Sequence, residues 1–275
     1  RFHFAEDKYS DSNEHLRTFF TYLSYLDVSG EAIAKLDLAA FKKDIQAGIA
    51  FDSSIPQGFG VGSSGALVAA IYDKYATDKI TVLENLTREK LLALKSIFAA
   101  MESFFHGKSS GLDPLNSYLS LPILINSKED IESANIPSQT LDGKGAVFLF
   151  DTGIVGETAP MVHIFMENMK QEGFRNMLKN QFVKHTDACV HDFLKGDVNS
   201  LFGNVKQLSK VVLDNFKPMI PPAFHILWKK GIDTNAYYLK LCGSGGGGYM
   251  LGFTEDIDEA RTALKGHTLE VVYNF

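Results

Sequence analysis

Apolar residues recur at helical spacing along much of this chain, and the pattern predicts helices in both halves. The longest one runs over residues 88–106, where Leu91, Leu94, Phe98, Met101 and Phe105 fall on one stripe. Other helices are expected at residues 15–26, 37–47, 64–76 and 257–264, with several more between 161 and 230.

Shorter apolar runs predict strands between these helices. They are expected at residues 1–8, 48–55, 118–125, 145–150 and 268–275, and on both sides of a glycine run at 243–248. Residues 126–144 are polar and contain a proline and a glycine, so we expect a domain junction there. The pattern indicates an α+β fold with two domains, residues 1–134 and 135–275.

Composition narrows the function classes. The 275 residues are 45% hydrophobic, enough for a core, and the net charge of −6 makes nucleic acid an unexpected partner. No apolar run is long enough to cross a membrane, and the N-terminus lacks a signal-peptide pattern. Cys189 and Cys242 lie in different contexts, which suits a reducing compartment, so we expect a cytoplasmic protein.

The segment P-Q-G-F-G-V-G-S-S-G-A, from Pro56, leads directly into an apolar helix. Its glycines permit positive φ and a close approach by a ligand, and a helix N-terminus points amides at a phosphate. Its hydroxyls are suited to phosphate oxygens or magnesium. The alternative is a buried helix that is simply capped by Ser63 or Ser64.

Two carboxylates stand out next. Glu102 falls inside the apolar stripe of the long helix, where it must be paired, ligated or shifted in pKa. Alternatively, it borders the stripe and extends to solvent or pairs with Lys95. Asp113 follows the small residues Ser109, Ser110 and Gly111 and precedes a proline, a position where an aspartate is usually a turn former.

Five glycines surround Ser244 in the run 243–248. A simple hairpin turn needs one or two glycines. We therefore expect two closely packed backbones, or a backbone passing under a phosphate site.

Three stretches together, P-Q-G-F-G-V-G-S-S-G-A, H-G-K-S-S-G-L-D and K-L-C-G-S-G-G-G-G, resemble the GHMP small-molecule kinases in order and spacing. The H-G-x-x-S-G-x-D form resembles the mevalonate kinases within that superfamily. The resemblance covers about Phe51 to the C-terminus. It implies an N-terminal S5-domain-2-like α/β domain that binds ATP and a C-terminal ferredoxin-like α+β domain.

The resemblance also implies roles for particular residues. The ATP phosphates would lie on Gly58, Gly60, Gly62, Ser63, Ser64 and Gly65. Ser64 and Glu102 would hold Mg²⁺, Asp113 would face the substrate hydroxyl as the catalytic residue, and Thr158 would contact substrate. The motif Gly243, Ser244, Gly245 and Gly246 would pack near the phosphates.

The implied activity is ATP-dependent phosphorylation of the mevalonate 5-hydroxyl, giving 5-phosphomevalonate for isoprenoid biosynthesis. The alternatives are another GHMP kinase, acting on phosphomevalonate, a sugar or homoserine, or an inactive nucleotide-binding regulatory protein. The family also suggests a homodimer.

The chain departs from the family pattern at several positions. Val61, Gly65 and Ser109 stand where the family usually has leucine, alanine and, in mevalonate kinases, proline. The family's first motif, with a lysine near the reacting oxygens, has no counterpart before Phe51. We expect that a segment carrying it precedes Arg1; loss of the motif would instead favour the regulatory alternative.

Overall fold

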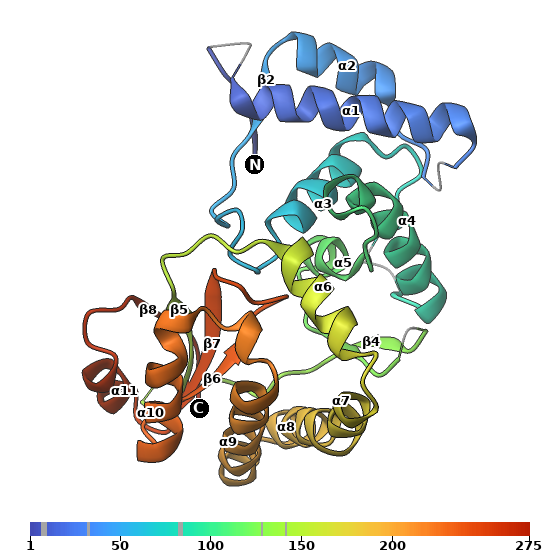
Figure 1. The fold of residues 1–275 in the computed structure, drawn as a ribbon. Coiled ribbons are helices and arrows are strands. Elements are labelled where there is room, and N and C mark those ends of the chain that lie inside the picture. The colour runs from blue at the N-terminus through green and yellow to red at the C-terminus, as the bar shows by residue number, and fades with distance from the viewer. Residues whose placement is uncertain (7–9, 32–33, 82–84, 128, 141) are drawn as a thin grey trace. The chain divides into compact units, whose positions relative to one another are not determined.

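The computed structural model describes residues 1–275 except 7–9, 32–33, 82–84, 128 and 141. The chain forms two compact units, each with its own hydrophobic core. Figure 1 shows the helices and strands of the chain. Unit 1 comprises Arg1–Pro56 and Gly62–Ala134, and unit 2 comprises Gln57–Val61 and Asn135–Phe275. Within the described residues, no helix is both long enough and apolar enough to span a membrane.

Unit 1 is built mainly from helices around one core. Its helices are α1 (Asp11–Ser29), α2 (Leu38–Gln46), α3 (Ser63–Tyr75), α4 (Arg88–His106) and α5 (Leu112–Leu119). Two short antiparallel pairs accompany them, β1 (Phe2–Phe4) with β2 (Ile49–Phe51) and β3 (Ile123–Ile125) with β4 (Ile131–Ser133). Fully buried side chains such as Phe19, Phe41, Ile71 and Phe98 fill the core between the helices.

Local sequence signals set the helix ends. Ser10, Asp37 and Thr87 are the N-caps of α1, α2 and α4, and each side chain accepts a hydrogen bond from an amide of the first turn. Gly30 ends α1 in the left-handed conformation. The predicted helix over 88–106 is confirmed with the same bounds.

The predicted strand over 118–125 is wrong in its first part. Residues up to Leu119 belong to α5, and only Ile123–Ile125 is a strand. Pro114 lies in the first turn of α5, where a missing N–H costs nothing, and Leu115 and Leu119 are buried one helical turn apart. The strand predicted at 1–8 is present over Phe2–Phe4, with residues 7 and 8 outside the described part of the chain, and the strand predicted at 48–55 spans Ile49–Phe51.

A four-stranded antiparallel sheet organises unit 2. Its strands are β5 (Ala146–Asp151), β6 (Tyr238–Leu241), β7 (Tyr249–Thr254) and β8 (Leu269–Asn274), in the spatial order β6-β7-β5-β8. Along the chain, helices follow β5, a hairpin joins β6 to β7, and α11 (Ile257–Ala263) precedes β8. This is the β-α-β-β-α-β arrangement of a ferredoxin-like domain, as predicted.

The helices between β5 and β6 share one core with that sheet. They are α6 (Thr158–Asn168), α7 (Glu172–Met177), a π-helical turn (Leu178–Val183), α8 (Lys184–Lys195), α9 (Val198–Asn215) and α10 (His225–Thr234). Short 3₁₀ turns at Lys217–Met219 and Pro222–Phe224 separate α9 from α10. Trp228 is fully buried in this core and donates from its indole nitrogen to the Ser209 hydroxyl at 2.9 Å.

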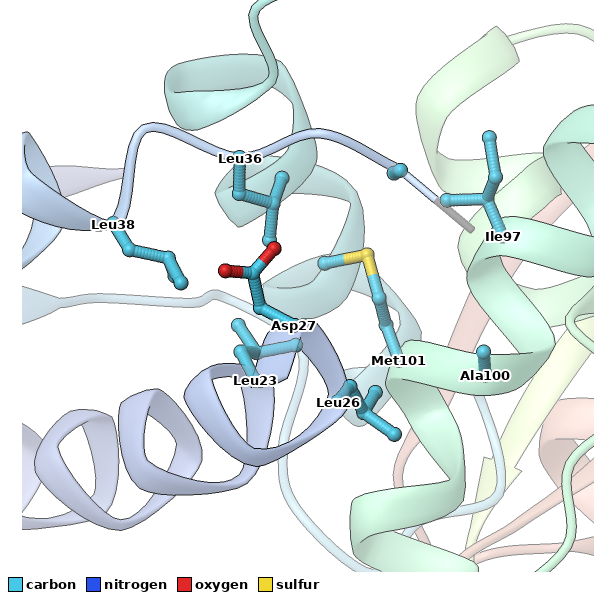
Figure 2. Close-up of a pocket in the computed structure, with 9 residues that line it drawn as sticks. Leu23, Leu26, Asp27, Leu36, Leu38, Ile97, Ala100 and Met101 are labelled. Carbon is cyan, nitrogen blue, oxygen red and sulfur yellow. The ribbon is translucent and has the colours of Figure 1, made fainter. Parts of the chain in front are cut away.

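A small cavity lies inside unit 1, between α1, α4 and the segment that leads into α2 (Figure 2). Its volume is about 20 Å³, and its walls are mostly apolar, including Leu23, Leu26, Ile97 and Met101. Asp27 is the one carboxylate among the residues labelled there. The cavity has room for about one water molecule and includes none of the candidate site residues.

Candidate active site

The first part of the glycine loop before α3, Gln57–Val61, belongs to unit 2 and is bound there through backbone hydrogen bonds. The carbonyl of Gly58 accepts from the Gly156 amide at 2.8 Å, and the carbonyl of Phe59 accepts from the Tyr249 amide at 3.0 Å. The loop residues Gly58, Gly60 and Gly62 have φ between +72° and +79°. Positive φ at alternating positions explains why glycine occupies them.

The glycine run 243–248 connects β6 to β7, which are antiparallel partners. It is therefore a hairpin loop, the interpretation that the number of glycines argued against. The excess of glycines has its own cause, since a Cβ at Gly248 would overlap the backbone of Phe59 and one at Gly243 would lie 3.3 Å from the Gly60 carbonyl oxygen. Two backbones pack closely here, as expected.

Gly62 is the N-cap of α3, with a left-handed backbone and no side-chain cap. The alternative that Ser63 or Ser64 caps this helix is therefore wrong, because both lie inside its first turn. The positive end of the α3 dipole therefore follows a glycine loop and carries the hydroxyl groups of Ser63 and Ser64. Such an arrangement favours an anionic ligand.

Glu102 is buried in α4, with 3% of its surface exposed, so it does not extend to solvent. Its Oε1 accepts a hydrogen bond from the Ser64 hydroxyl at 3.0 Å, and its Oε2 accepts a short one from the Ser109 hydroxyl. Helix α3 and the loop after α4 thus each supply one donor to the same carboxylate. These two bonds satisfy both oxygens of a charge that would otherwise be costly to bury.

Asp113 is exposed in the first turn of α5, and its side chain lies beside the N-terminus of α3. A Cβ built on Gly62 would lie 3.5 Å from Cγ of Asp113 and 3.7 Å from Oδ2. Gly65 brings the two helices together, since a Cβ there would be 2.7 Å from the Asp113 carbonyl carbon. The aspartate is therefore part of a helix rather than of a simple turn, and it lies near the first turn of α3, which contains Ser63 and Ser64.

Thr158 is the first residue of α6 in unit 2 and is exposed. Met161 of the same helix lies against the glycine hairpin. Its side chain is so close to Gly246 that a Cβ added there would lie 2.9 Å from the Cγ of Met161. The start of α6, the glycine loop and the hairpin with Gly243, Ser244 and Gly245 are therefore neighbours within unit 2.

Ser64 and Glu102 fit a magnesium ion by the chemistry of their donors. Both offer hard oxygen ligands, and Mg²⁺ is usually bound by one or two carboxylates together with phosphate oxygens and water. Among the described residues, no group of three or more His, Cys, Asp and Glu side chains is placed to hold a metal ion. A magnesium ion at Glu102 would therefore depend on ligands from a bound phosphate.

The sequence did not identify two residues that shape this site. The sequence pattern marks Ser109 only as one of several small residues and as a departure from proline, yet its side chain bonds directly to Glu102. Gly111 lets the loop fold back onto α4, because a Cβ there would lie 2.6 Å from the Ala99 amide nitrogen. The available signal was the run of small residues between Lys108 and Leu112.

Comparison with known proteins supports the resemblance for part of the chain. Residues 29–120 match the model of the family described as GHMP kinases N terminal domain. The matched segment includes the glycine loop, Glu102 and Asp113. No curated protein sequence matches the chain significantly.

Solved structures extend the likeness to nearly the whole chain. L. major mevalonate kinase, solved with R-mevalonate, matches with a TM-score of 0.58 at 18% identity, over 92% of this chain and 79% of that one. Streptococcus pneumoniae phosphomevalonate kinase, solved with phosphomevalonate and AMPPNP, matches with a TM-score of 0.60 at 15% identity, over 99% and 88%. The Lin0012 protein from Listeria innocua matches with a TM-score of 0.59 at 15% identity, over 96% and 78%.

These identities are low, so the structural likeness is one of fold, and the family match rests on the N-terminal segment. The family match and the structural likeness are consistent with each other. Residues 29–120 match the GHMP kinase N-terminal domain family, and the chain has an α+β fold similar to those of a mevalonate kinase and a phosphomevalonate kinase.

Proposed function

We propose that this protein is an ATP-dependent small-molecule kinase that transfers the γ-phosphoryl group of ATP to the 5-hydroxyl of mevalonate. The observation that carries the proposal is the buried Glu102 carboxylate, which Ser64 bonds from the first turn of α3, with Asp113 beside the same turn. The H-G-x-x-S-G-x-D form of residues 106–113 favours mevalonate over other acceptors. L. major mevalonate kinase, solved with R-mevalonate, has a similar fold.

In this proposal, residues 1–134 form the ATP-binding domain and residues 135–275 form the C-terminal domain of a GHMP kinase. The amides and hydroxyls between Gly58 and Gly65 bind the phosphates of ATP, next to the positive end of α3. Ser64 and Glu102 would hold Mg²⁺, which neutralises phosphate charge when bound. As the family resemblance implies, Thr158 would contact the substrate, and the hairpin residues Gly243–Gly246 would pack near the phosphates.

Asp113 acts on the acceptor. Its carboxylate accepts the proton of the mevalonate 5-hydroxyl as that oxygen bonds to the γ-phosphorus, while the bond from this phosphorus to the bridging oxygen of ADP breaks. Phosphoryl transfer otherwise needs mainly positioning and charge neutralisation.

The test is ADP release by the purified protein with Mg²⁺ and ATP, run in parallel with mevalonate, phosphomevalonate, galactose and homoserine. We expect release with mevalonate alone. Release with phosphomevalonate alone would contradict mevalonate as the substrate but would still support a kinase activity. Streptococcus pneumoniae phosphomevalonate kinase has a similar fold. ATP binding without release for any acceptor would favour the regulatory alternative.

Substitution of Asp113 tests the assigned base. Asp113→Asn should lower kcat by about 10²–10⁴-fold while ATP binding is kept, because the change removes a proton acceptor and little volume. Asp27→Asn is the matched control, since Asp27 is an exposed carboxylate of unit 1 that lines the cavity in Figure 2 rather than the candidate site. Full activity of Asp113→Asn would rule out the assignment.

A further inference from the structure

Ser109 makes a contact that the family pattern does not provide, because mevalonate kinases usually have proline at this position. Its hydroxyl donates a short hydrogen bond to Oε2 of Glu102. The same hydroxyl oxygen accepts from the Gly111 amide at 3.0 Å. A hydroxyl has a single proton, and an incoming N–H occupies one lone pair, so the proton of Ser109 is directed at the carboxylate.

The backbone of Ser109 is fixed as well. Its amide donates to the Ser103 hydroxyl at 3.3 Å, and that hydroxyl donates to the Ala99 carbonyl at 2.7 Å. The loop after α4 is therefore tied to the last turns of the helix that carries Glu102. Gly111, whose missing side chain admits the α4 backbone, holds the loop in this position.

The two oxygens of Glu102 face different elements. Oε1 is bonded by Ser64 in the first turn of α3, and Oε2 is bonded by Ser109 in the loop after α4. An ion bound by Ser64 and Glu102 needs Oε1, since that is the oxygen beside the Ser64 hydroxyl. Oε2 can keep its bond to Ser109 throughout, so this bond would fix the rotation of the carboxylate while Oε1 binds the ion.

We propose that Ser109 is a positioning residue that holds the Glu102 carboxylate so that Oε1 faces Ser64 and a divalent cation. The inference rests on the proposed function, since it concerns the metal site of that kinase. Partners that hydrogen-bond to metal ligands orient them, and removing such a partner typically lowers metal affinity by about 10–100-fold. Ser109 takes this part in the present chain through a side chain that proline lacks.

The experiment measures Mn²⁺ binding by electron paramagnetic resonance in the presence of ADP, without any acceptor substrate. Ser109→Ala should raise the Kd for Mn²⁺ by about tenfold or more, and Ser109→Thr, which keeps the hydroxyl, should restore most of the affinity. Ser110→Ala is the matched control, because this neighbouring hydroxyl accepts from the Leu112 amide and is exposed. ADP affinity without metal and the thermal midpoint, measured on each variant, separate loss of the metal site from loss of folding.

The outcomes distinguish the inference from the proposed function. Equal Mn²⁺ affinity in the parent and in folded Ser109→Ala would overturn the positioning role, whatever the substrate proves to be. A parent protein that binds ADP but no Mn²⁺ would overturn the metal site itself. Mn²⁺ binding that depends on Ser109, together with no turnover of mevalonate, would contradict only the proposed substrate and would support the inference.

Discussion

Asn13 shows how one buried polar side chain ties elements together. Its amide group is fully buried in α1 and donates to the carbonyls of Ile45 and Ile49, at 3.2 Å and 2.7 Å. Its Oδ1 accepts from Nε of Arg17 at 2.9 Å. A single side chain therefore satisfies backbone groups at the end of α2 and the start of β2.

We expect Asn13→Ala to lower the free energy of unfolding by about 1–3 kcal/mol, because the Ile45 and Ile49 carbonyls each lose a buried donor, while the Ile45 carbonyl still accepts from the Gly48 amide. Urea unfolding followed by circular dichroism measures the change. Thr18→Ala in the same helix is the control; Thr18 is exposed and bonds only one turn back along α1, so its loss should change stability by less than about 0.5 kcal/mol. Equal effects of the two substitutions would contradict the role given to Asn13.

Among the elements, the contact between α3 and α5 decides where Asp113 lies. Gly65 is in the first turn of α3, where alanine would be favoured by helix propensity. The backbone of Asp113 and Pro114 lies so close that a Cβ at Gly65 would be 2.7 Å from both the Asp113 carbonyl carbon and the Pro114 nitrogen. The close approach explains why this chain has glycine where the family usually has alanine.

Gly65→Ala should therefore destabilise unit 1 by about 1–3 kcal/mol and lower kcat, because α5 must move away with its aspartate. Gly203→Ala is the control for a glycine that has free space around its missing Cβ. Gly203 lies inside α9 with nothing near its missing Cβ, so alanine should stabilise the protein by up to about 1 kcal/mol. Thermal unfolding and ADP release measure both; stabilisation by Gly65→Ala would show that the two helices have room to adjust.

At the scale of the whole molecule, each compact unit has a hydrophobic core of its own. Trp228 is the only tryptophan of the chain and lies in the core of unit 2, so its fluorescence reports on that unit. Tyr237 is buried in the same core and donates to the Leu227 carbonyl at 2.7 Å. Burial raises the pKa of Tyr237 from 10.0 to about 12.

This raised pKa predicts alkaline destabilisation of unit 2. The unfolded chain releases the Tyr237 proton near pH 10 and the folded protein only near pH 12, so the stabilisation is fully present below pH 10 and is lost as the pH rises through about 12. Urea unfolding followed by Trp228 fluorescence between about pH 9 and about pH 11 measures the slope. Tyr237→Phe should reduce the slope, and an unchanged slope would contradict the assignment.

The ferredoxin-like domain was implied by the family resemblance. Local patterns in the sequence predicted the helices with clear caps and periodicity, an α+β pattern, and the short stretches that carry the family motifs. These features are local, since caps, glycine turns and apolar spacing act within a few residues. For this reason the extent of α4 and the glycine loop before α3 could be predicted from the sequence.

Only the tertiary structure decided which groups meet. The pairing of Glu102 with Ser64 and Ser109 depends on how α3, α4 and the following loop pack, over separations of 38 and 7 residues. The helix α5 was missed because its stability comes from burying Leu115 and Leu119 against neighbours rather than from its short sequence. Side-chain contacts between distant segments are set by packing of the whole unit, and local patterns do not contain that information.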